Sequence, residues 1–278
     1  MMQHDKEFEF TREDFDYLRK LVTETTGIIA DDDKYTLYYT RLARRVRKLG
    51  LKNFTEYRNY LNANKESELI ELVNSVTTNL TAFFRENHHF EFLAETIVGK
   101  AKKRGDRKIR IWSAGCSTGE EPYSIAITLA ENIPDFKSWD IKILATDIDS
   151  NVVKKASGGV YEMARVDGMD KTRLKKFFKK GTGHNSGFVR VNPELRDMIS
   201  FSQLNLLHQW PIKDTLDCIF CRNVVIYFDK PTKEKLVERY ADLIMDDGYL
   251  FMGHSESLYK STDRFKLLGK TIYQKVTA

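Results

Sequence analysis

The sequence predicts an α/β protein in which an all-helical N-terminal domain precedes a doubly wound parallel sheet. Between about residues 11 and 95, apolar residues recur at helical spacing and proline is absent. From residue 108 onward, strand-like runs alternate with helix-like runs, as in a parallel sheet with crossover helices. We therefore expect two domains, 1–95 and 96–278, with the exposed basic run 101–108 as the linker.

The composition excludes several classes of protein. Hydrophobic residues make up 41% of the chain and charged residues 31%, so the 278 residues can build a packed core. A net charge of +5 is too small to make a nucleic acid the default partner. No apolar run is long enough to span a bilayer, and the first residues lack the pattern of an export signal. Three cysteines, an odd number, are expected to be reduced thiols in the cytoplasm.

The helical region carries a face of positive charge besides its apolar face. Leu42, Val46 and Leu49 have the spacing of a buried face, and on another face of the same helix stand Arg41, Arg44, Arg45 and Lys48. Further helices are expected at 54–63, 66–80 and 87–103. A cationic helix face is most often only solvated, and the ten acids among residues 1–33 offer it a partner within the chain.

Each element after residue 108 has its own signal. Strands are predicted from short apolar runs, helices from apolar periodicity, and a closing hairpin from a glycine between two short strands. The predicted strands are 108–116, 140–149, 216–223 and 248–254, the helices are 119–132, 151–156 and 231–245, and the hairpin is 265–276. A small antiparallel insertion is expected near 170–200, because glycines and alternating apolar residues fill the stretch 181–205.

Three strand ends offer candidate ligand groups, because ligands of such sheets bind beyond the carboxyl ends of the strands. They are a turn of small residues followed by Glu120 and Glu121, then Asp147, then Arg222 with Asn223. The turn is not Gly-x-Gly-x-x-Gly, and two carboxylates beside it would repel a phosphate. A phosphate-free cation with a ribose, such as S-adenosylmethionine, fits, with Asp147 on the ribose hydroxyls.

Both acidic positions also have a purely structural interpretation. Asp147 is an alternative N-cap for the following helix, although Asp149 or Ser150 is better placed for that role. Glu120 and Glu121 also favour the start of a helix without binding any ligand. The strand ends alone therefore leave the ligand open.

Five segments, in order, resemble the CheR family of chemotaxis receptor methyltransferases. They are TTNLTAFFRENHHF (77–90), WSAGCSTGEEPYSIAITLA (112–130), ATDID (145–149), FCRNVVIYF (220–228) and GHSES (253–257). The resemblance covers nearly the whole chain. It implies a helical N-terminal domain and a Rossmann-like methyltransferase domain with an inserted antiparallel β-subdomain. It also implies transfer of a methyl group from S-adenosylmethionine to chemoreceptor glutamates, which leaves S-adenosylhomocysteine.

The resemblance further implies roles for single residues. The implied cofactor-binding residues are Asn79, Thr81, Arg85, Glu121, Asp147, Asn205, Leu206, Arg222 and Asn223. Arg85 and Tyr227 are similar to residues that the family places near the transferred methyl group. The substrate is expected to be the acidic cytoplasmic region of a chemoreceptor, held by Arg41, Arg44, Arg45 and Lys48, with a receptor C-terminal peptide at Gly181 and Gly183. We expect a monomer with no metal, no nucleic acid and no membrane insertion.

Other interpretations stand beside these. Tyr227 is by default a core or rim aromatic, and Arg85 is by default a structural ion-pair partner. His88 with His89, and Cys218 with Cys221, suggest a metal site, but two residues three apart in a strand point to opposite faces. A rival function is a non-catalytic adaptor of the same fold that binds S-adenosylmethionine or S-adenosylhomocysteine. The presence of Arg85, Glu121, Asn223 and Tyr227 favours the enzyme.

Overall fold

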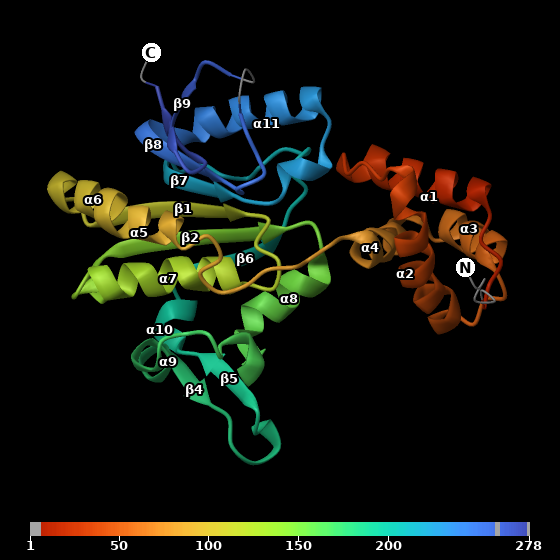
Figure 1. Cartoon of the computed structure of the whole chain (residues 1–278), viewed down its shortest axis with the longest axis horizontal. Coiled ribbons are helices and arrows are strands. Elements are labelled where there is room, and N and C mark those ends of the chain that lie inside the picture. Colours follow the sequence, from red (N-terminus) through yellow and green to blue (C-terminus); the bar gives the residue numbers. More distant parts are fainter. Residues whose placement is uncertain (1–6, 259–261, 277–278) are drawn as a thin grey trace.

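The N-terminal domain is built from helices α1 (Arg12–Thr26), α2 (Tyr35–Lys48), α3 (Phe54–Ala63) and α4 (Lys65–Val76), with a 3-10 turn η1 (Asp32–Lys34) before α2. In this computed structural model, which describes residues 7–258 and 262–276, these helices form the lobe at the right of Figure 1. Helix α1 begins where Thr11 and Asp14 cap each other's backbone N–H groups. Apolar side chains from all four helices form a core of their own, Phe15, Leu42, Phe54 and Leu72 among them.

The second domain is built on a sheet whose strand order is β6-β2-β1-β7-β8-β10-β9. Its strands are β1 (Lys108–Ala114), β2 (Asp140–Asp147), β6 (Ile199–Gln203), β7 (Leu216–Cys221), β8 (Ile244–Met252), β9 (Phe265–Gly269) and β10 (Ile272–Lys275). Strands β6 to β8 in this order are parallel, and the hairpin β9–β10 is antiparallel. Because the chain runs outward from β1 through β2 on one side and through β7 on the other, ligands are expected at the carboxyl ends of these three strands.

Helices cover both faces of this sheet. Helix α5 (His88–Phe92), the π-helical turn η2 (Leu93–Ile97), α6 (Val98–Arg104) and α7 (Glu120–Asn132) pack on one face, and α11 (Lys230–Leu243) packs on the other (Figure 1). Residues of β7 alternate between the two cores, so Cys218 lies with α7 and Cys221 lies with α11. The prediction that these two cysteines point to opposite faces is confirmed.

A small antiparallel sheet of order β3-β5-β4 projects from the larger domain (Figure 1). It consists of β3 (Val160–Glu162), β4 (Phe178–Lys180) and β5 (Phe188–Val191), with α9 (Lys171–Phe177), η4 (Met163–Arg165), η5 (Gly183–Asn185) and α10 (Pro193–Arg196). Helix α8 (Ser150–Gly158) leads into it, and the 3-10 turns η3 (Phe136–Ser138) and η6 (Val225–Tyr227) lie elsewhere in the domain. The predicted β-subdomain is therefore present, and it begins earlier than expected because Val160 pairs with Arg190.

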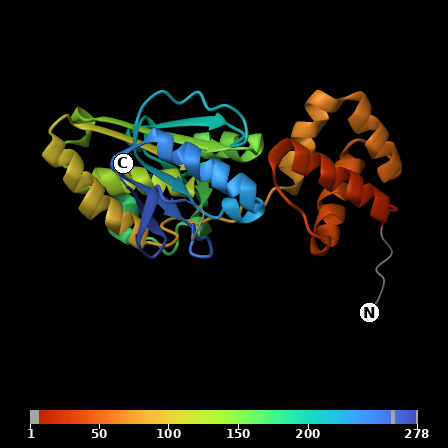
Figure 2. The same ribbon diagram turned by 90° about the horizontal axis from the view of Figure 1, so that it is seen from above.

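The division between the domains lies earlier than the sequence suggested. Phe90, Leu93 and Ile97 pack into the core beneath the sheet, so residues 88–104 belong to the α/β domain. The chain crosses between the lobes in the segment 77–87, and both views show the lobes side by side (Figures 1 and 2). The run 101–108, predicted as the linker, instead ends α6 and begins β1.

Two further expectations differ in detail. Residues 199–203, expected inside the insertion, form β6 at the edge of the main sheet and pair in parallel with β2. Their alternation of apolar residues and serines is typical of a strand, but it does not show which of the two sheets the strand joins. The helix expected over 66–80 ends at Val76, because Thr77 turns to an extended conformation and faces the other domain. Within the described residues, no helix combines the length and apolar character that crossing a bilayer requires.

Candidate functional site

A pocket lies between the two domains, at the carboxyl ends of β1, β2 and β7. Its walls come from the helical domain, from the segment 76–85 and from the loops that follow these strands. Its empty space is about 1250 Å³, part of which is open to solvent. The structure brings together at this pocket Tyr227 and all the residues that the resemblance implied for cofactor binding, namely Asn79, Thr81, Arg85, Glu121, Asp147, Asn205, Leu206, Arg222 and Asn223.

The turn after β1 leaves its backbone open to the pocket. Gly115 has a φ of +106°, and a Cβ there would lie 2.3 Å from Cγ2 of Val224 in the turn after β7. Only glycine lets these two turns close on each other. Ser117 then directs its backbone N–H at Oδ2 of Asp147, 2.8 Å away.

Asp147, at the end of β2, is held by backbone N–H groups alone. Its Oδ2 accepts from Ser117, and its Oδ1 accepts from Asp149 at 3.0 Å. No ion pair of Asp147 occurs within residues 7–258 and 262–276, and burial raises the pKa of its carboxyl. Asp149 caps α8 through Oδ1, so the expectation that a neighbour frees Asp147 from that role is confirmed.

Glu121, in the first turn of α7, is a buried carboxylate with a fixed cationic partner. Its Oε2 lies 3.0 Å from Nη1 of Arg222, and its Oε1 accepts from Oγ of Ser113 at 2.7 Å. Burial raises the pKa of Glu121, and the charge of Arg222 opposes that rise. Glu120 pairs instead with Arg165 of η4, so of the two adjacent glutamates only Glu121 lines the pocket.

The segment around Arg85 is held in a strained conformation. Phe84 and Glu86 have φ angles of +53° and +56°, which are costly for residues with a Cβ. The backbone N–H of Phe84 donates to Oγ of Ser124 at 3.0 Å, and the guanidinium of Arg222 donates to the carbonyl of Arg85. Arg85 itself donates from Nη1 to the Leu80 carbonyl at 3.1 Å. In the described part of the chain its Nε and Nη2 donate no hydrogen bond, so two donors remain for a ligand.

The helical domain is fastened across the mouth of this site. Nδ2 of Asn79 and Oγ1 of Thr77 both donate to Oδ2 of Asp149, at 2.8 and 3.0 Å. On the other side Nδ2 of Asn205 donates to the Thr25 carbonyl at 2.7 Å. The carbonyl of Tyr227 accepts from the backbone of Ile29 at 2.9 Å, while the Tyr227 hydroxyl has no hydrogen bond among the described residues. Both domains therefore contribute to the pocket.

The cationic face of α2 is not one exposed surface, contrary to expectation. The side chain of Arg45 is only 13% exposed and pairs with Glu68 and Glu71 on α4. Arg41 donates to the carbonyls of Val76 and Thr77, at 2.7 and 2.6 Å. Arg44 and Lys48 remain exposed. Helical spacing predicted the face correctly but not the acceptors on α4 that occupy half of it.

The two glycines assigned to peptide binding lie in the hairpin between β4 and β5, away from the pocket. Gly183 has a φ of +57°, and a Cβ on Gly181 would lie 2.1 Å from the Asn185 carbonyl oxygen. Both positions therefore favour glycine for the shape of the hairpin itself.

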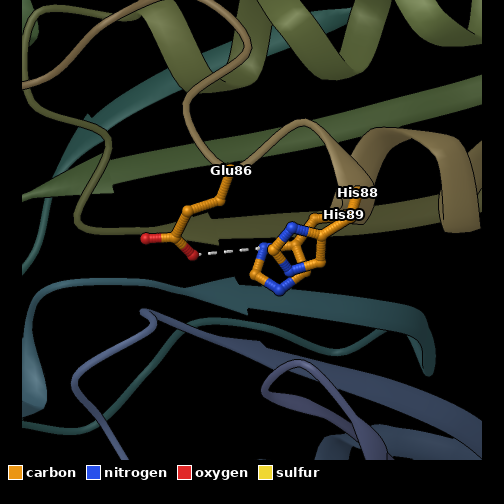
Figure 3. Close-up of side chains that lie close together, drawn as sticks. All are labelled: Glu86, His88 and His89. Atoms are coloured by element: carbon orange, nitrogen blue, oxygen red, sulfur yellow. Dashed lines mark ion pairs between the residues drawn. The ribbon is translucent and has the colours of Figure 1, made fainter.

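Glu86, His88 and His89 bring carboxylate and imidazole atoms close together (Figure 3). Nδ1 of His89 lies 3.7 Å from Oε2 of Glu86, and Nε2 of each histidine contacts the Lys270 carbonyl. Burial lowers the pKa of His89 to about 3, so the ring is neutral near pH 7. Arg222 lies 3.4 Å from the same Glu86 oxygen and already supplies positive charge there, so we propose no metal at this cluster.

Sequence reasoning missed residues that hold the pocket without lining it. The carboxylate of Glu256 accepts hydrogen bonds from the loop that carries Asn223. Arg165 of the β-subdomain donates to the Thr81 carbonyl at 2.7 Å. The segment GHSES was noted only for its resemblance. The sequence did offer one indication of its role. The segment follows a predicted strand, and the loops that follow parallel strands meet at the same edge of the sheet.

Comparison with known proteins identifies relatives along nearly the whole chain. A family model described as "CheR methyltransferase, all-alpha domain" matches residues 13–77, and one described as "CheR methyltransferase, SAM binding domain" matches residues 79–274. "Chemotaxis protein methyltransferase 2" of Pseudomonas aeruginosa is 46% identical over 270 residues, which cover 97% of this chain and 95% of that protein. The chemotaxis protein methyltransferases of Salmonella typhimurium and Escherichia coli are 44% and 43% identical, covering 91% and 93% of this chain and 87% and 89% of theirs.

Proposed function

The chain belongs to the CheR methyltransferase family, and on this premise we propose that it methylates glutamate side chains of chemoreceptors with S-adenosylmethionine. Relatives of 43% to 46% identity are named methyltransferases, which favours an enzyme over a non-catalytic adaptor. The observation that carries the proposal is the interdomain pocket, which combines buried Asp147 and Glu121 with Nε and Nη2 of Arg85, two nitrogens that donate no hydrogen bond within the described residues.

The pocket suits an adenosyl cofactor with positive charge and no phosphate. Each oxygen of Asp147 accepts one backbone N–H and keeps acceptor capacity for a ribose hydroxyl. We propose that Glu121 meets the charged methionine end, while the charge of Arg222 opposes the rise that burial causes in the pKa of this glutamate. The glycine turn offers no basic side chain to a phosphate. When bound, S-adenosylmethionine supplies a methyl group activated by its positively charged sulfur.

The proposed acceptor needs orientation rather than activation. A glutamate side chain is already ionised near neutral pH, so no strong general base is required. We propose that Nε and Nη2 of Arg85 hold its two oxygens as a fork, and that the Tyr227 hydroxyl sets its direction. The chain otherwise contributes by aligning the acceptor and by excluding water. Water would slow the transfer, because it stabilises the separated ions more than the transition state, in which their charges are partly neutralised.

For the receptor we propose Arg44 and Lys48 as the contact with an acidic helical region, and the β4–β5 hairpin as the contact with a C-terminal peptide. Reversing both charges, Arg44→Glu with Lys48→Glu, should slow methylation of receptor membranes at low ionic strength and much less at high salt. Arg45 is left alone because reversal there would break its pair with Glu68. Equal initial rates for variant and wild type at low salt would exclude these two residues.

The test of the function is transfer of labelled methyl groups from S-adenosylmethionine to membranes that bear chemoreceptors. Glutamate esters release the label as methanol in mild base, so base-labile label on the receptor supports the proposal. Label that survives base indicates a nitrogen or carbon acceptor. If the chain binds the cofactor but transfers no label, the result would favour a non-catalytic adaptor.

A further inference from the structure

Glu256 lies in the loop after β8, and its carboxylate is surrounded by backbone N–H groups. The residue is 3% exposed. Oε2 accepts from the N–H groups of Gly253 and Asn223, at 2.6 and 2.7 Å. Oε1 accepts from those of Val224 and Ile226, at 2.9 and 3.2 Å. Across residues 7–258 and 262–276 no cationic side chain pairs with it, so backbone dipoles stabilise its charge.

Three of these donors belong to the turn after β7, which forms a wall of the pocket. Asn223 and Val224 line the pocket, and Asn223 is held at a φ of +59°. Val224 packs directly over Gly115 of the glycine turn. Asn223 and Val224 precede the 3-10 turn η6 and Ile226 lies at its start, so these N–H groups have no partner within that turn. The Glu256 carboxylate satisfies them and fixes the shape of the turn.

The loop that carries Glu256 is itself fastened at both ends. A Cβ on Gly253 would lie 2.5 Å from Nδ2 of Asn223 and 2.8 Å from Oε2 of Glu256, so the backbone approaches closely there. His254 contacts Oε1 of Glu86 through its backbone and its ring. Leu258 is buried, and its backbone donates to the Tyr273 hydroxyl at 3.1 Å. Glu256 is therefore presented to the turn at a fixed position.

We infer that Glu256 is a positioning residue for the cofactor: it holds the turn after β7 against the glycine turn, and so sets the wall formed by Asn223 and Val224. It does not line the pocket, so its effect passes through the turn. This inference rests on the proposed use of the pocket for S-adenosylmethionine and S-adenosylhomocysteine.

The test is Glu256→Gln in the full chain, with S-adenosylhomocysteine binding measured by calorimetry. A carboxamide in either orientation sets its NH₂ against two backbone N–H groups, so affinity should fall by roughly tenfold to a hundredfold. The KM for S-adenosylmethionine should rise in step, with kcat at saturating cofactor changed by less than about threefold. If Glu256 only stabilised the fold, its replacement would reduce the fraction of folded protein. The apparent kcat would then fall, while the affinity of the folded molecules for the cofactor would stay unchanged.

The matched control is Glu238→Gln on α11, whose side chain is 46% exposed and pairs with Arg264. It should bind S-adenosylhomocysteine as wild type does. Glu256→Asp keeps both oxygens on a shorter stem, so its affinity should lie between wild type and the amide, and it is the decisive variant if the amide does not fold. Wild-type affinity in the folded Glu256 variant, or an equal loss in the control, would overturn the inference. A wild-type chain that binds no S-adenosylhomocysteine would instead overturn the proposed function.

Discussion

Two arginines at the pocket have different surroundings. Arg222 is buried, and its Nη1 and Nη2 atoms contact Glu121, Glu86 and the Arg85 carbonyl, while its Nε has no hydrogen bond within the described residues. Arg85 keeps Nε and Nη2 without a hydrogen bond among the described residues. Arg222 therefore acts inside the protein, and Arg85 is the one able to meet an incoming carboxylate.

We expect Arg85→Ala to lower methyl transfer by about a hundredfold or more, because the fork that aligns the acceptor is lost. Tyr227→Phe should lower it by about tenfold, since one directed hydrogen bond is removed. The measurement is labelled methyl transfer under saturating cofactor. Arg107→Ala, at an arginine that precedes β1 and has a 59% exposed side chain, serves as the control, and wild-type rates in both pocket variants would end the assignment.

His89 gives the fold a specific sensitivity to acid. Its pKa is lowered to about 3 by burial, while an unfolded chain takes up the proton near pH 6.5. The stability contribution of the neutral ring is therefore complete above pH 6.5 and is lost as the pH falls toward 3. Between pH 7 and pH 5 the loss is about 2 kcal/mol.

The variant His89→Gln keeps a donor for the Lys270 carbonyl but does not titrate. The free energy of unfolding, measured in urea, should fall between pH 7 and pH 5 for both proteins. The fall should be about 2 kcal/mol smaller for the variant than for wild type. His184→Gln, at an exposed position of the β-subdomain, should leave the wild-type difference unchanged. The same pH dependence in wild type and His89→Gln would show that the buried ring is not its source.

At the scale of elements, the glycine turn between β1 and α7 is the most constrained. Gly115→Ala would place a Cβ 2.3 Å from Val224 at a φ of +106°. We expect it to weaken S-adenosylhomocysteine binding at least tenfold, because the two turns are pushed apart, with a loss of about 1–3 kcal/mol in stability. Gly99→Ala is the control: nothing lies near its Cβ, and a helical glycine replaced by alanine should gain up to about 1 kcal/mol. Unchanged binding in Gly115→Ala would mean that the turn does not shape the pocket.

Helices and strands that have a signal in their own sequence could be predicted. The features that depend on contacts between distant parts of the chain could not. β1, β2, α7 and α11 follow from apolar runs and periodicity, and the hairpin β9–β10 from its glycine. Strand β6 alternates apolar and polar residues, which is a local strand signal, but nothing in this pattern shows that it pairs with β2 and not within the insertion. Residues 88–95 were assigned to the first domain, because helical periodicity shows which face of a helix is apolar but not which core that face meets.

The same limit applies to the site. Residues in the turn after β1 and at the end of β2 could be predicted because strand ends converge at one edge of a sheet. The role of Glu256 could not, since four backbone N–H groups from two loops create it. The pairing of Arg45 with Glu68 could not be predicted either. It joins α2 to α4, and the spacing of residues within α2 does not show how these two helices pack.

At the scale of the whole molecule, Asp149 joins the domains. Its Oδ1 caps α8, and its Oδ2 accepts from Thr77 and Asn79. Asp149→Asn keeps a capping oxygen but turns an amide toward these two donors. We expect thermolysin to cleave this variant several times faster before Leu80, which is 79% exposed, as the segment 77–87 loosens.

The control for this experiment is Asp170→Asn, which alters a helix cap on α9 away from the domain interface. Its cleavage at Leu80 should match wild type. If Asp149→Asn is cleaved no faster than this control, the contacts with Asp149 do not restrain the segment between the domains.

The shared pocket has a consequence for building chimaeras between relatives. A splice in the segment 77–87 looks clean along the chain, yet Thr25, Ile29 and Tyr38 travel with one parent while Asn205, Tyr227 and Asp149 travel with the other. A hybrid assembled at that splice inherits part of its ligand chamber from each parent, so exchanging the helical domain also exchanges part of the pocket wall. If the exposed side of α2 contacts the receptor as proposed, a graft of that side alone would leave the inner face of the helical lobe as it was.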